Sequence, residues 1–412
     1  MSSKETSLAL PGNDGAETAR KAVSPLQTVY FYLTEGCNLR CRHCWLEPPH
    51  QSGKKQFPSL DSDLFRSIIR QARPLGLASV KLTGGEPLMH PRIGEILSIL
   101  RDEKLRFNVE TNGVLCTPEL AHELVRSGMF HVSVSLDGAD ADTHEWVRGV
   151  KGCFEAALQG VRNLVAAGIR PQVIMTLMRR NVGQIEQLVR LAESLGCSSV
   201  KFNLVQPTAR GVKMHEAGET LPVREIVRLG EWVENELSTG TKLILHYSHP
   251  VAFRPLGRIY GREGSGCGVC NVHRILGVLG NGSYALCGIG ETVPELVFGH
   301  AAHDSLAEVW NGNPVLREIR EGLPNRLGGI CGNCLMKGIC LGSCIAQNYY
   351  KDRDLWAPYW YCEEAQREGL FPESRRHARP AHNGPGSLRK RTGVRPCPGS
   401  EVLGASQGGT PV

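Results

Sequence analysis

The chain has 412 residues, enough for one large domain and a smaller one, and its 41% hydrophobic and 21% charged content is typical of a globular protein. The formal charge is +6, but residues 373–412 carry seven Lys or Arg against two Glu, so the rest of the chain is close to neutral. Net charge therefore does not indicate nucleic-acid binding, and no run of about 18 apolar residues predicts a membrane span.

Both ends of the chain are expected to be disordered. Residues 1–25 and 373–412 are rich in Gly, Pro, Ser and charged side chains. The N-terminus has no apolar core of signal-peptide length, so we expect a cytoplasmic protein. In that reducing compartment, cysteines are more often metal ligands or catalytic groups than disulfide bridges.

Between these ends, segments typical of strands alternate with segments typical of helices. The predicted strands are Val29–Leu33, Ser79–Leu82, Phe107–Glu110, His131–Leu136, Gln172–Leu177 and Val200–Val205. The predicted helices are Leu60–Arg73, Pro91–Arg101, Pro118–Ser127, Phe154–Ala167 and Gln184–Leu195, with Pro91 and Pro118 in the first turn. Six strand–helix units predict an α/β fold, with a parallel sheet curled into a partial (β/α)6 TIM-like barrel. Such sheets bind ligands at the carboxyl ends of their strands.

A helix near Val223–Glu236 and an extended segment, Lys242–Tyr247, are expected to close a barrel domain at residues 26–247. After a linker at residues 248–260, the sequence becomes rich in Gly and Cys and has little apolar periodicity. A region of this composition needs a substitute for an apolar core. We therefore expect a small, cysteine-rich, metal-stabilised domain at residues 261–372.

Eleven of the fifteen cysteines fall into an order typical of iron–sulfur ligands. Cys37, Cys41 and Cys44 form a Cys-x3-Cys-x2-Cys motif after the first predicted strand. The other eight are Cys267, Cys270, Cys287, Cys331, Cys334, Cys340, Cys344 and Cys362. Since a closed four-iron cluster takes four thiolates, eight suffice for two clusters, whereas three leave one iron open to a small molecule. Of the remaining cysteines, Cys116, Cys153 and Cys197 are expected to be buried apolar residues and Cys397 a free thiol.

Zinc is the alternative metal for both groups of cysteines. His43 could be the fourth ligand beside the first three cysteines, and the C-terminal cysteines could form a pair of zinc ribbons. In the iron–sulfur interpretation, the open iron would instead chelate the amino and carboxylate groups of an amino-acid-like ligand.

The sequence Gly84-Gly85-Glu86-Pro87 follows the second predicted strand, at the same edge of the sheet as the first cysteines. Two glycines let the backbone approach a ligand closely. Together with the cysteine motif one strand earlier, this segment makes the chain resemble the radical SAM superfamily over about residues 26–247. In that superfamily, S-adenosylmethionine binds the open iron of a [4Fe-4S] cluster and is cleaved reductively.

The resemblance implies further contacts to the cofactor. Ser135, in a Ser-Leu-Asp-Gly segment with Asp137, is similar in position to a serine that contacts the ribose. Arg148 resembles an arginine near the methionyl carboxylate, which a guanidinium can bind through two hydrogen bonds. His43 resembles an aromatic position beside the adenine. Alternatively, Ser135 is a strand-end cap and Arg148 a surface charge; Thr111-Asn112-Gly113 is assigned no role.

The C-terminal cysteines resemble the SPASM extension of radical SAM enzymes. That resemblance implies two auxiliary [4Fe-4S] clusters, three clusters in all, with interleaved ligands. One cluster would be held by Cys267, Cys270, Cys287 and Cys344, and the other by Cys331, Cys334, Cys340 and Cys362. Spacing alone would instead group Cys344 with Cys331, Cys334 and Cys340.

The resemblance implies an oxidoreductase-like enzyme that uses a 5′-deoxyadenosyl radical to take hydrogen from an unactivated C–H bond. Closed auxiliary clusters would conduct an electron toward the surface, which favours a net oxidation. Enzymes with this extension most often modify peptides, so we expect a crosslink, thioether or desaturation in a precursor peptide or protein. The SynChlorMet-cassette subgroup of peptide maturases is similar. A flavodoxin or ferredoxin would supply the electron.

Two features narrow these expectations. Cys287 is followed by Gly288, where anaerobic sulfatase maturases carry an Asp as a base, so that activity is not expected. The residues before the barrel are too few for a fused leader-peptide domain, so we expect a separate peptide-recognition protein or direct docking on the SPASM region. No general acid or base is assigned, although Asp137, Tyr284 and Glu291 lie near the motifs.

Two alternative functions stay open. One is a radical SAM enzyme acting on a small molecule, such as a tetrapyrrole side chain. The other is a non-enzymatic iron–sulfur scaffold or redox sensor. The three-cysteine motif argues against it, because a scaffold would have no use for a cluster with one open iron.

Overall fold

A computed structural model describes residues 23–51, 57–260 and 270–377 of the chain. The described residues up to Arg376 belong to one compact unit, built on a ten-stranded sheet with the order β10-β9-β8-β1-β2-β3-β4-β5-β6-β7. Neighbouring strands from β8 through β7 in this order pair in parallel, and β9 and β10 add an antiparallel edge. The predicted α/β fold with a parallel, barrel-like sheet is confirmed.

All six predicted strands are present, with ends that differ from the predicted ones by at most two residues. They are β1 (Thr28–Tyr32), β2 (Ser79–Thr83), β3 (Phe107–Thr111), β4 (Met129–Ser135), β5 (Gln172–Leu177) and β6 (Ser199–Leu204). The predicted extended segment at residues 242–247 contains a seventh strand, β7 (Ile244–Tyr247), which pairs in parallel with β6.

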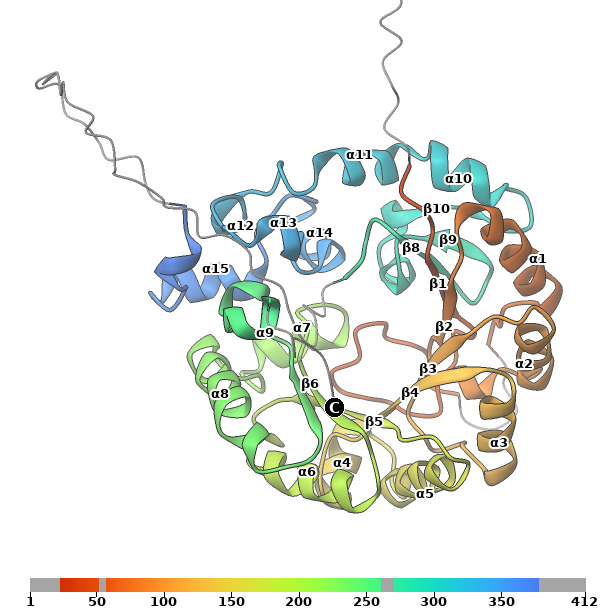
Figure 1. Ribbon diagram of the computed structural model, residues 1–412, viewed down its shortest axis with the longest axis horizontal. Coiled ribbons are helices and arrows are strands. Elements are labelled where there is room, and N and C mark those ends of the chain that lie inside the picture. Colours follow the sequence, from red (N-terminus) through yellow and green to blue (C-terminus); the bar gives the residue numbers. More distant parts are fainter. Residues whose placement is uncertain (1–22, 52–56, 261–269, 378–412) are drawn as a thin grey trace, which may run out of the picture. The chain divides into compact units, whose positions relative to one another are not determined.

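Helices surround the outside of the strands (Figure 1). They are α1 (Ser62–Ala72), α2 (Ile93–Asp102), α3 (Pro118–Arg126), α4 (Ala141–Arg148), α5 (Cys153–Ala166), α6 (Ile185–Ser194), α7 (Arg210–Glu216) and α8 (Val223–Asn235). The predicted start of α2 was wrong, because Pro91 precedes this helix instead of occupying its first turn. Helices α4 and α7 were not predicted, because eight and seven residues show little periodicity.

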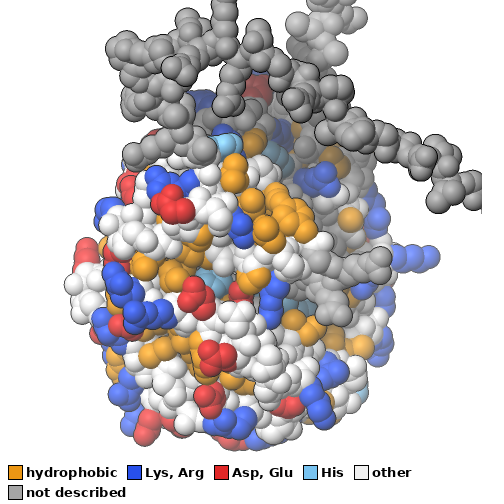
Figure 2. Space-filling model, turned by 60° about the vertical axis from the view of Figure 1, so that its left-hand side comes forward, with side chains coloured by type: hydrophobic (Ala, Val, Ile, Leu, Met, Phe, Trp, Pro, Cys, Tyr) orange, Lys and Arg blue, Asp and Glu red, His pale blue; other side chains and the backbone are white. Residues whose placement is uncertain are grey.

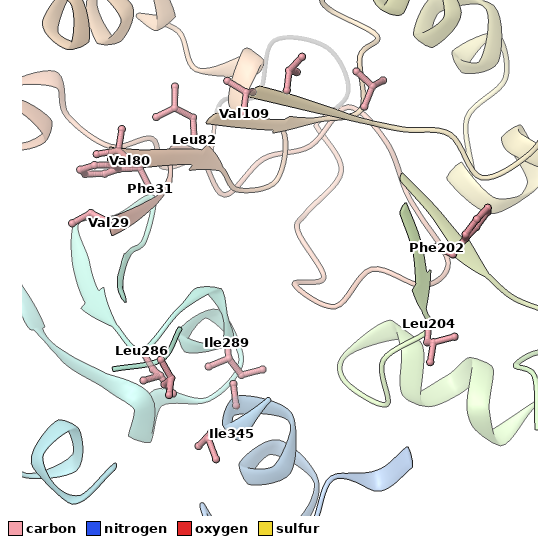
Figure 3. Close-up of a cluster of buried hydrophobic side chains, with 14 of the residues drawn as sticks. Val29, Phe31, Val80, Leu82, Val109, Phe202, Leu204, Leu286, Ile289 and Ile345 are labelled. Carbon is pink, nitrogen blue, oxygen red and sulfur yellow. The ribbon is translucent and has the colours of Figure 1, made fainter. Parts of the chain in front are cut away.

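The apolar core lies between the sheet and these helices. Phe31, Val80, Leu82, Val109 and Phe202 are fully buried on the outward side of their strands (Figure 3). Because side chains alternate along a strand, the intervening residues face the inside of the curved sheet. These inward residues are largely polar and include Tyr30, Lys81, Glu110, Ser135, Lys201 and His246. The inside of this barrel is therefore suited to a polar ligand.

The cysteine-rich part of the chain continues the same sheet. After α9 (Leu256–Tyr260), strand β8 (Ile275–Val278) pairs in parallel with β1, and β9 (Ser283–Ala285) and β10 (Val297–His300) follow. The helices are α10 (Leu306–Gly312), α11 (Pro314–Gly322), α12 (Gly329–Gly332), α13 (Lys337–Cys340), α14 (Ile345–Asp352) and α15 (Trp360–Arg367). Among the described residues, no helix has the length and apolar character of a membrane span.

Candidate functional site

A cavity of about 380 Å³ lies at the carboxyl ends of the parallel strands. All nine residues predicted to hold the cofactor or its cluster line this cavity: Cys37, Cys41, His43, Cys44, Gly84, Gly85, Glu86, Ser135 and Arg148. They lie at the ends of three different strands, β1, β2 and β4, or in the segments that follow these strands, so the fold brings together residues that are up to about a hundred positions apart in the sequence.

The first cysteine loop is held in place by backbone hydrogen bonds. The N–H groups of Arg40 and Arg42 donate to the carbonyls of Arg148 and Val147, both at 2.9 Å. Arg210, which begins α7, donates through its guanidinium to the carbonyls of Cys41 (3.3 Å) and Pro48 (2.8 Å). A role for Arg210 was not predicted, because this arginine after β6 has no motif around it.

The glycine loop packs directly on the cysteine loop. A Cβ atom at Gly85 would lie 2.1 Å from the carbonyl oxygen of Gly36, and Gly84 has a φ of +134°. The N–H groups of Gly85 and Glu86 donate to the carbonyls of Thr34 and Gly36, both at 3.0 Å. Glycine is therefore required here for the approach of two loops, in addition to any approach to a ligand.

Glu86 connects the glycine loop to the end of β3. Its carboxylate is 1% exposed and accepts hydrogen bonds from Thr111 Oγ1 (2.7 Å), the Asn112 N–H (2.8 Å) and the Leu88 N–H (3.1 Å). Burial raises the pKa of Glu86, although these hydrogen bonds oppose the shift. The side chain of Asn112 then donates to Asn38 Oδ1 at 2.7 Å.

Thr111 and Asn112, to which no role was assigned from the sequence, thus line the cavity and order the cysteine loop. The signal that could have found them is their position directly after a strand, at the same edge of the sheet as the two motifs.

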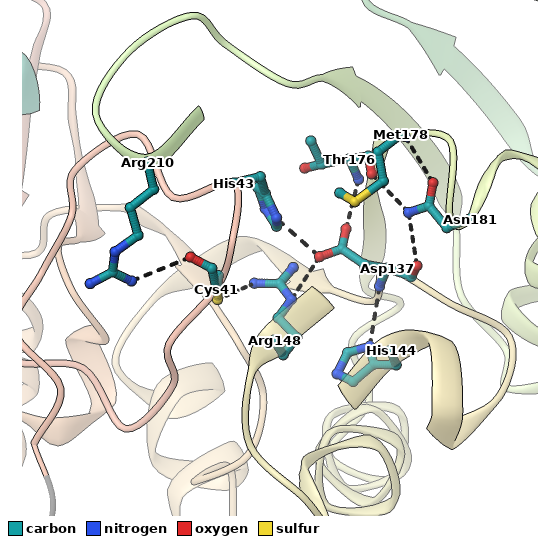
Figure 4. Close-up of polar contacts among 9 residues, drawn as sticks. All are labelled: Cys41, His43, Asp137, His144, Arg148, Thr176, Met178, Asn181 and Arg210. Carbon is teal, nitrogen blue, oxygen red and sulfur yellow. Dashed lines mark hydrogen bonds and ion pairs between the residues drawn. The ribbon is translucent and has the colours of Figure 1, made fainter. Parts of the chain in front are cut away.

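Asp137 and Arg148 form a buried ion pair beside the cysteine loop (Figure 4). Arg148 Nε lies 2.7 Å from Asp137 Oδ2, and Arg148 Nη1 lies 3.5 Å from Cys41 Sγ. The other carboxylate oxygen of Asp137 accepts from the Thr176 N–H at 2.7 Å, and Asn181 Nδ2 donates to the Asp137 carbonyl at 2.9 Å. Arg148 is 7% exposed, so it is not the surface charge of the alternative interpretation.

The electrostatics of this group favour a charged Asp137–Arg148 pair among neutral histidines. Burial by itself would raise the pKa of Asp137, but Arg148 and then His43 bring it below its usual value. Burial lowers the pKa of His43 to about 4, and that of His144 to about 3. His43 Nε2 lies 3.7 Å from Asp137 Oδ2, so this ring is turned toward a carboxylate.

Three cysteines from the C-terminal part line the same cavity. Cys287 follows β9, Cys344 directly precedes α14, and Cys270 lies before β8. Burial and the neighbouring Cys344 thiol raise the pKa of Cys287 to about 12. Cys267, the predicted fourth ligand of this group, lies outside the described residues.

The other four cysteines line a separate small pocket. Cys331, Cys334, Cys340 and Cys362 surround it together with apolar side chains that include Leu327 and Phe371. Cys331 and Cys362 are hydrogen-bonded to each other. The structure therefore groups Cys362 with Cys331, Cys334 and Cys340, and it groups Cys344 with Cys270 and Cys287.

The donor set of these pockets suits iron–sulfur clusters. Each group consists of thiols alone, which is the ligand set of such clusters and also of some zinc sites. His43, the candidate fourth zinc ligand, is directed at Asp137 instead. Among residues 23–51, 57–260 and 270–377, no three potential ligands are already at metal-binding separation, and no cysteine forms a disulfide. Cys116, Cys153 and Cys197 are buried, as predicted.

Comparisons with known proteins agree with this chemistry. Two family descriptions match the chain: the radical SAM superfamily at residues 31–192, and the SPASM iron–sulfur cluster-binding domain at residues 267–335. The chain is 31% identical to an AdoMet-dependent heme synthase of Methanosarcina barkeri over 346 residues, which cover 81% of this chain and 95% of the relative.

Two further relatives are similar over most of their length. Mycofactocin maturase MftC of Mycobacterium tuberculosis is 27% identical over 389 residues, covering 90% of this chain and 94% of the relative. The crystal structure of Streptococcus suis SuiB bound to its precursor peptide SuiA aligns with a TM-score of 0.64 at 18% identity, covering 82% of this chain and 76% of SuiB. This last match shows a shared fold.

Proposed function

The chain belongs to the radical SAM superfamily and is an enzyme with an iron–sulfur SPASM region, and we propose that it oxidatively modifies a peptide. The observation that carries the proposal is a single cavity lined by two groups of three cysteines. Cys37, Cys41 and Cys44 come from one side of the fold, and Cys270, Cys287 and Cys344 come from another. A substrate in this cavity would be close to both groups.

The cofactors of this enzyme are S-adenosylmethionine and iron–sulfur clusters. We propose three [4Fe-4S] clusters, a radical SAM core at residues 26–247 and a SPASM domain at residues 261–372. Cys37, Cys41 and Cys44 would hold the S-adenosylmethionine-binding cluster. Cys267, Cys270, Cys287 and Cys344 would hold one auxiliary cluster, and Cys331, Cys334, Cys340 and Cys362 the other. When bound, the first cluster supplies the electron that cleaves S-adenosylmethionine to methionine and a 5′-deoxyadenosyl radical.

The residues around the first cysteines would orient S-adenosylmethionine. Asp137 fixes Arg148 through Nε, which keeps the guanidinium at the cavity wall, where it would pair with the methionyl carboxylate. Ser135 would contact the ribose, and the neutral His43 ring would lie against the adenine. Gly84 and Gly85 would bring backbone carbonyls close to the amino group. If this wall excludes water when the cofactor is bound, it would protect the radical from side reactions.

A peptide substrate is supported by two relatives. MftC is named as a maturase of mycofactocin, and SuiB was crystallised with its precursor peptide. We therefore propose a precursor peptide for this enzyme, with a flavodoxin or ferredoxin as electron donor and a separate protein or the SPASM region as the recognition element. The second candidate is a small carboxylated molecule such as a tetrapyrrole, because the heme synthase is 31% identical.

The test is an anaerobic assay of the reconstituted protein with S-adenosylmethionine and dithionite. We expect 5′-deoxyadenosine, and mass analysis of a co-expressed candidate peptide should show the loss of two hydrogen atoms. Cys41→Ala should abolish both products, while Cys197→Ala, a buried cysteine away from the cavity, should retain them. Without 5′-deoxyadenosine from the wild-type protein, only the scaffold or sensor interpretation would survive.

A further inference from the structure

The cavity between the two cysteine groups contains a charged pair that the proposed chemistry does not use. Lys81 on β2 and Glu110 on β3 both line the cavity, and Lys81 Nζ lies 2.5 Å from Glu110 Oε1. The side chain of Lys81 is 17% exposed. Burial disfavours its ammonium, but Glu110 opposes burial, and the pKa of Lys81 is raised overall. Lys81 is therefore a cation at neutral pH, fixed in the cavity wall.

The strand register places Lys81 near the C-terminal cysteines. Tyr30 of β1 pairs with Lys81 of β2 on one side and with Gly277 of β8 on the other. The Lys81 ammonium lies 4.9 Å from the centre of the Tyr30 ring. Beyond Tyr30, a Cβ atom at Gly277 would lie 2.8 Å from the Cα atom of Cys287. Lys81, Tyr30 and Cys287 therefore follow one another along the inner face of the sheet, and all three line the cavity.

The ammonium acts on the thiols of this cysteine group. Burial raises the pKa of Cys287 to about 12 and that of Cys270 above its usual range, and Lys81 opposes both shifts. Lys81 is among the described groups with the strongest influence on these two thiols, whereas Glu110 is not. The ammonium of the pair is therefore nearer to the thiols than the carboxylate is.

The N-terminal cysteines have different cations beside them. Arg148 Nη1 lies 3.5 Å from Cys41 Sγ, and Arg210 lowers the pKa of Cys44, which burial raises. Lys81 is not among the described groups with the strongest influence on Cys44. Lys81 therefore acts mainly on the C-terminal cysteines.

The position of Lys81 makes its charge effective. On the outer face seen in Figure 2, side chains of both signs are interspersed, and water and salt weaken the interactions of such exposed charges. A charge in a buried wall acts more strongly, because the effective dielectric constant there is lower. The fixed ammonium of Lys81 therefore affects the electrostatic potential at the thiols more than an exposed lysine can.

A nearby cation changes how readily an iron–sulfur cluster accepts an electron. Reduction adds one negative charge to the cluster and its thiolates, so a fixed positive charge stabilises the reduced form more than the oxidised form. The charge around a cluster is one determinant of its reduction potential. Lys81 should therefore make a cluster at Cys270, Cys287 and Cys344 a better electron acceptor.

We propose that Lys81 raises the reduction potential of the auxiliary cluster in the cavity, and that Glu110 holds the ammonium in place. This inference rests on the proposed function, because it assumes a [4Fe-4S] cluster at these C-terminal cysteines. In the proposed oxidation, the substrate loses a hydrogen atom to the 5′-deoxyadenosyl radical, and then a proton to water and an electron to this cluster. The cluster is thereby reduced by one electron, and Lys81 favours that transfer.

The experiment is a redox titration followed by EPR. It uses the variant Cys41→Ala/Cys331→Ala, in which the auxiliary cluster of the cavity alone should remain intact. Adding Lys81→Met should lower the ratio of reduced to oxidised cluster about tenfold at a given ambient potential, which is a shift of about 59 mV for one electron. Adding Lys242→Met, an exposed-lysine control, should leave the ratio unchanged. An unchanged ratio with Lys81→Met overturns the inference.

Two further variants separate the charge of Lys81 from a structural role. Lys81→Arg keeps the charge, so its ratio should lie closer to that of the wild-type lysine than to that of Lys81→Met. Lys81→Met/Glu110→Gln leaves no buried charge without its partner, so the fold should tolerate it. Its potential should still be lower than with the native pair, because the ammonium is the nearer charge. A native potential in this double variant would mean that the pair acts as a neutral unit and would contradict the inference.

A last comparison tests whether the effect is local. In the variant Cys287→Ala/Cys331→Ala, which should keep the N-terminal cluster, Lys81→Met should leave the potential unchanged; an equal shift there would contradict a role specific to the auxiliary cluster. If Cys41→Ala/Cys331→Ala with Lys81 intact gave no four-iron signal, the cluster assignment of the proposed function would be wrong. A four-iron signal whose potential does not depend on Lys81 would refute this inference alone.

Discussion

Arg148 joins two parts of the site, because its Nε lies 2.7 Å from Asp137 Oδ2 while its Nη1 lies 3.5 Å from Cys41 Sγ. One buried guanidinium therefore links the end of β4 to the middle cysteine of the first motif. The position of Arg148 depends on Asp137, which is itself fixed by the backbone N–H of Thr176 in β5 and the side chain of Asn181 just after β5. Asp137 is thus a positioning residue for the cluster loop.

Asp137→Asn should destabilise the protein, because it keeps the shape but leaves the Arg148 cation buried without its counter-charge. Breaking one side of a buried ion pair costs roughly 3–5 kcal/mol. Urea unfolding should show this loss, and isothermal calorimetry should show weaker S-adenosylmethionine binding by the reconstituted variant. Asp140→Asn is the matched control, since Asp140 is a helix N-cap where Asn serves equally well. Equal effects of the two substitutions would contradict the assigned role of Asp137.

Gly85→Ala should separate the glycine loop from the cysteine loop. The added Cβ would lie 2.1 Å from the Gly36 carbonyl oxygen, so backbone must move. We expect a lower melting temperature and a reduced iron content after reconstitution. Gly94→Ala is the control: nothing lies within 4 Å of its Cβ position in α2, and it should stabilise the protein by about 0.5–1 kcal/mol. If Gly85→Ala bound as much iron as the wild-type protein, close packing of the two loops would not be required for cluster binding.

The grouping of cysteines predicts which double substitutions act on one cluster. Cys344→Ala combined with Cys287→Ala should lose no more iron than Cys344→Ala alone, because both cysteines line the same cavity. Cys344→Ala combined with Cys340→Ala should lose the iron of two clusters, because Cys340 lines the separate pocket. Iron analysis and EPR of the reduced proteins measure this. If Cys344 instead behaved as one unit with Cys340, the grouping by spacing would be correct.

His249 should make the protein sensitive to acid. Burial lowers its pKa from 6.5 to about 3, while Nδ1 lies 3.2 Å from the Tyr361 hydroxyl. The unfolded chain therefore binds a proton that the folded one rejects, and the contribution to stability is lost as the pH falls from 6.5 toward 3. In this pH range, one such histidine lowers the free energy of unfolding by at most about 1.4 kcal/mol for each pH unit. His249→Gln should show a shallower fall of the unfolding free energy than the wild type or the exposed control His303→Gln; identical slopes would exclude His249 as the cause.

The sequence predicted the strands and the site residues best where short-range patterns determine the local structure. β-branched runs predicted six strands to within two residues. The cysteine and glycine motifs, together with the family resemblance that they support, predicted nine residues that meet in one cavity. The sequence around α4 does contain capping residues: Asp140 accepts a hydrogen bond from the Thr143 N–H, and Gly149 follows the helix with a φ of +73°. The helix has only eight residues, however, which is too short for an apolar periodicity to predict it.

Long-range pairing was not predictable in the same way. Ile275–Val278 is a four-residue strand whose partner, β1, lies some 250 residues earlier, and no local feature specifies that pairing. Arg210 donates to the carbonyls of Cys41 and Pro48, which lie 169 and 162 residues earlier in the sequence. The inward position of Lys201 follows from strand alternation, but the residues that surround it depend on the order of the strands in the sheet.

The central claim is that Cys37, Cys41 and Cys44 hold a cluster with one iron open to S-adenosylmethionine. It is tested most directly with the variant Cys287→Ala/Cys331→Ala, in which the N-terminal cluster alone should remain intact, by EPR of the reduced protein before and after addition of S-adenosylmethionine. The account predicts a four-iron signal that changes when S-adenosylmethionine binds. A spectrum that does not respond, or zinc in place of iron at these three cysteines, would contradict it.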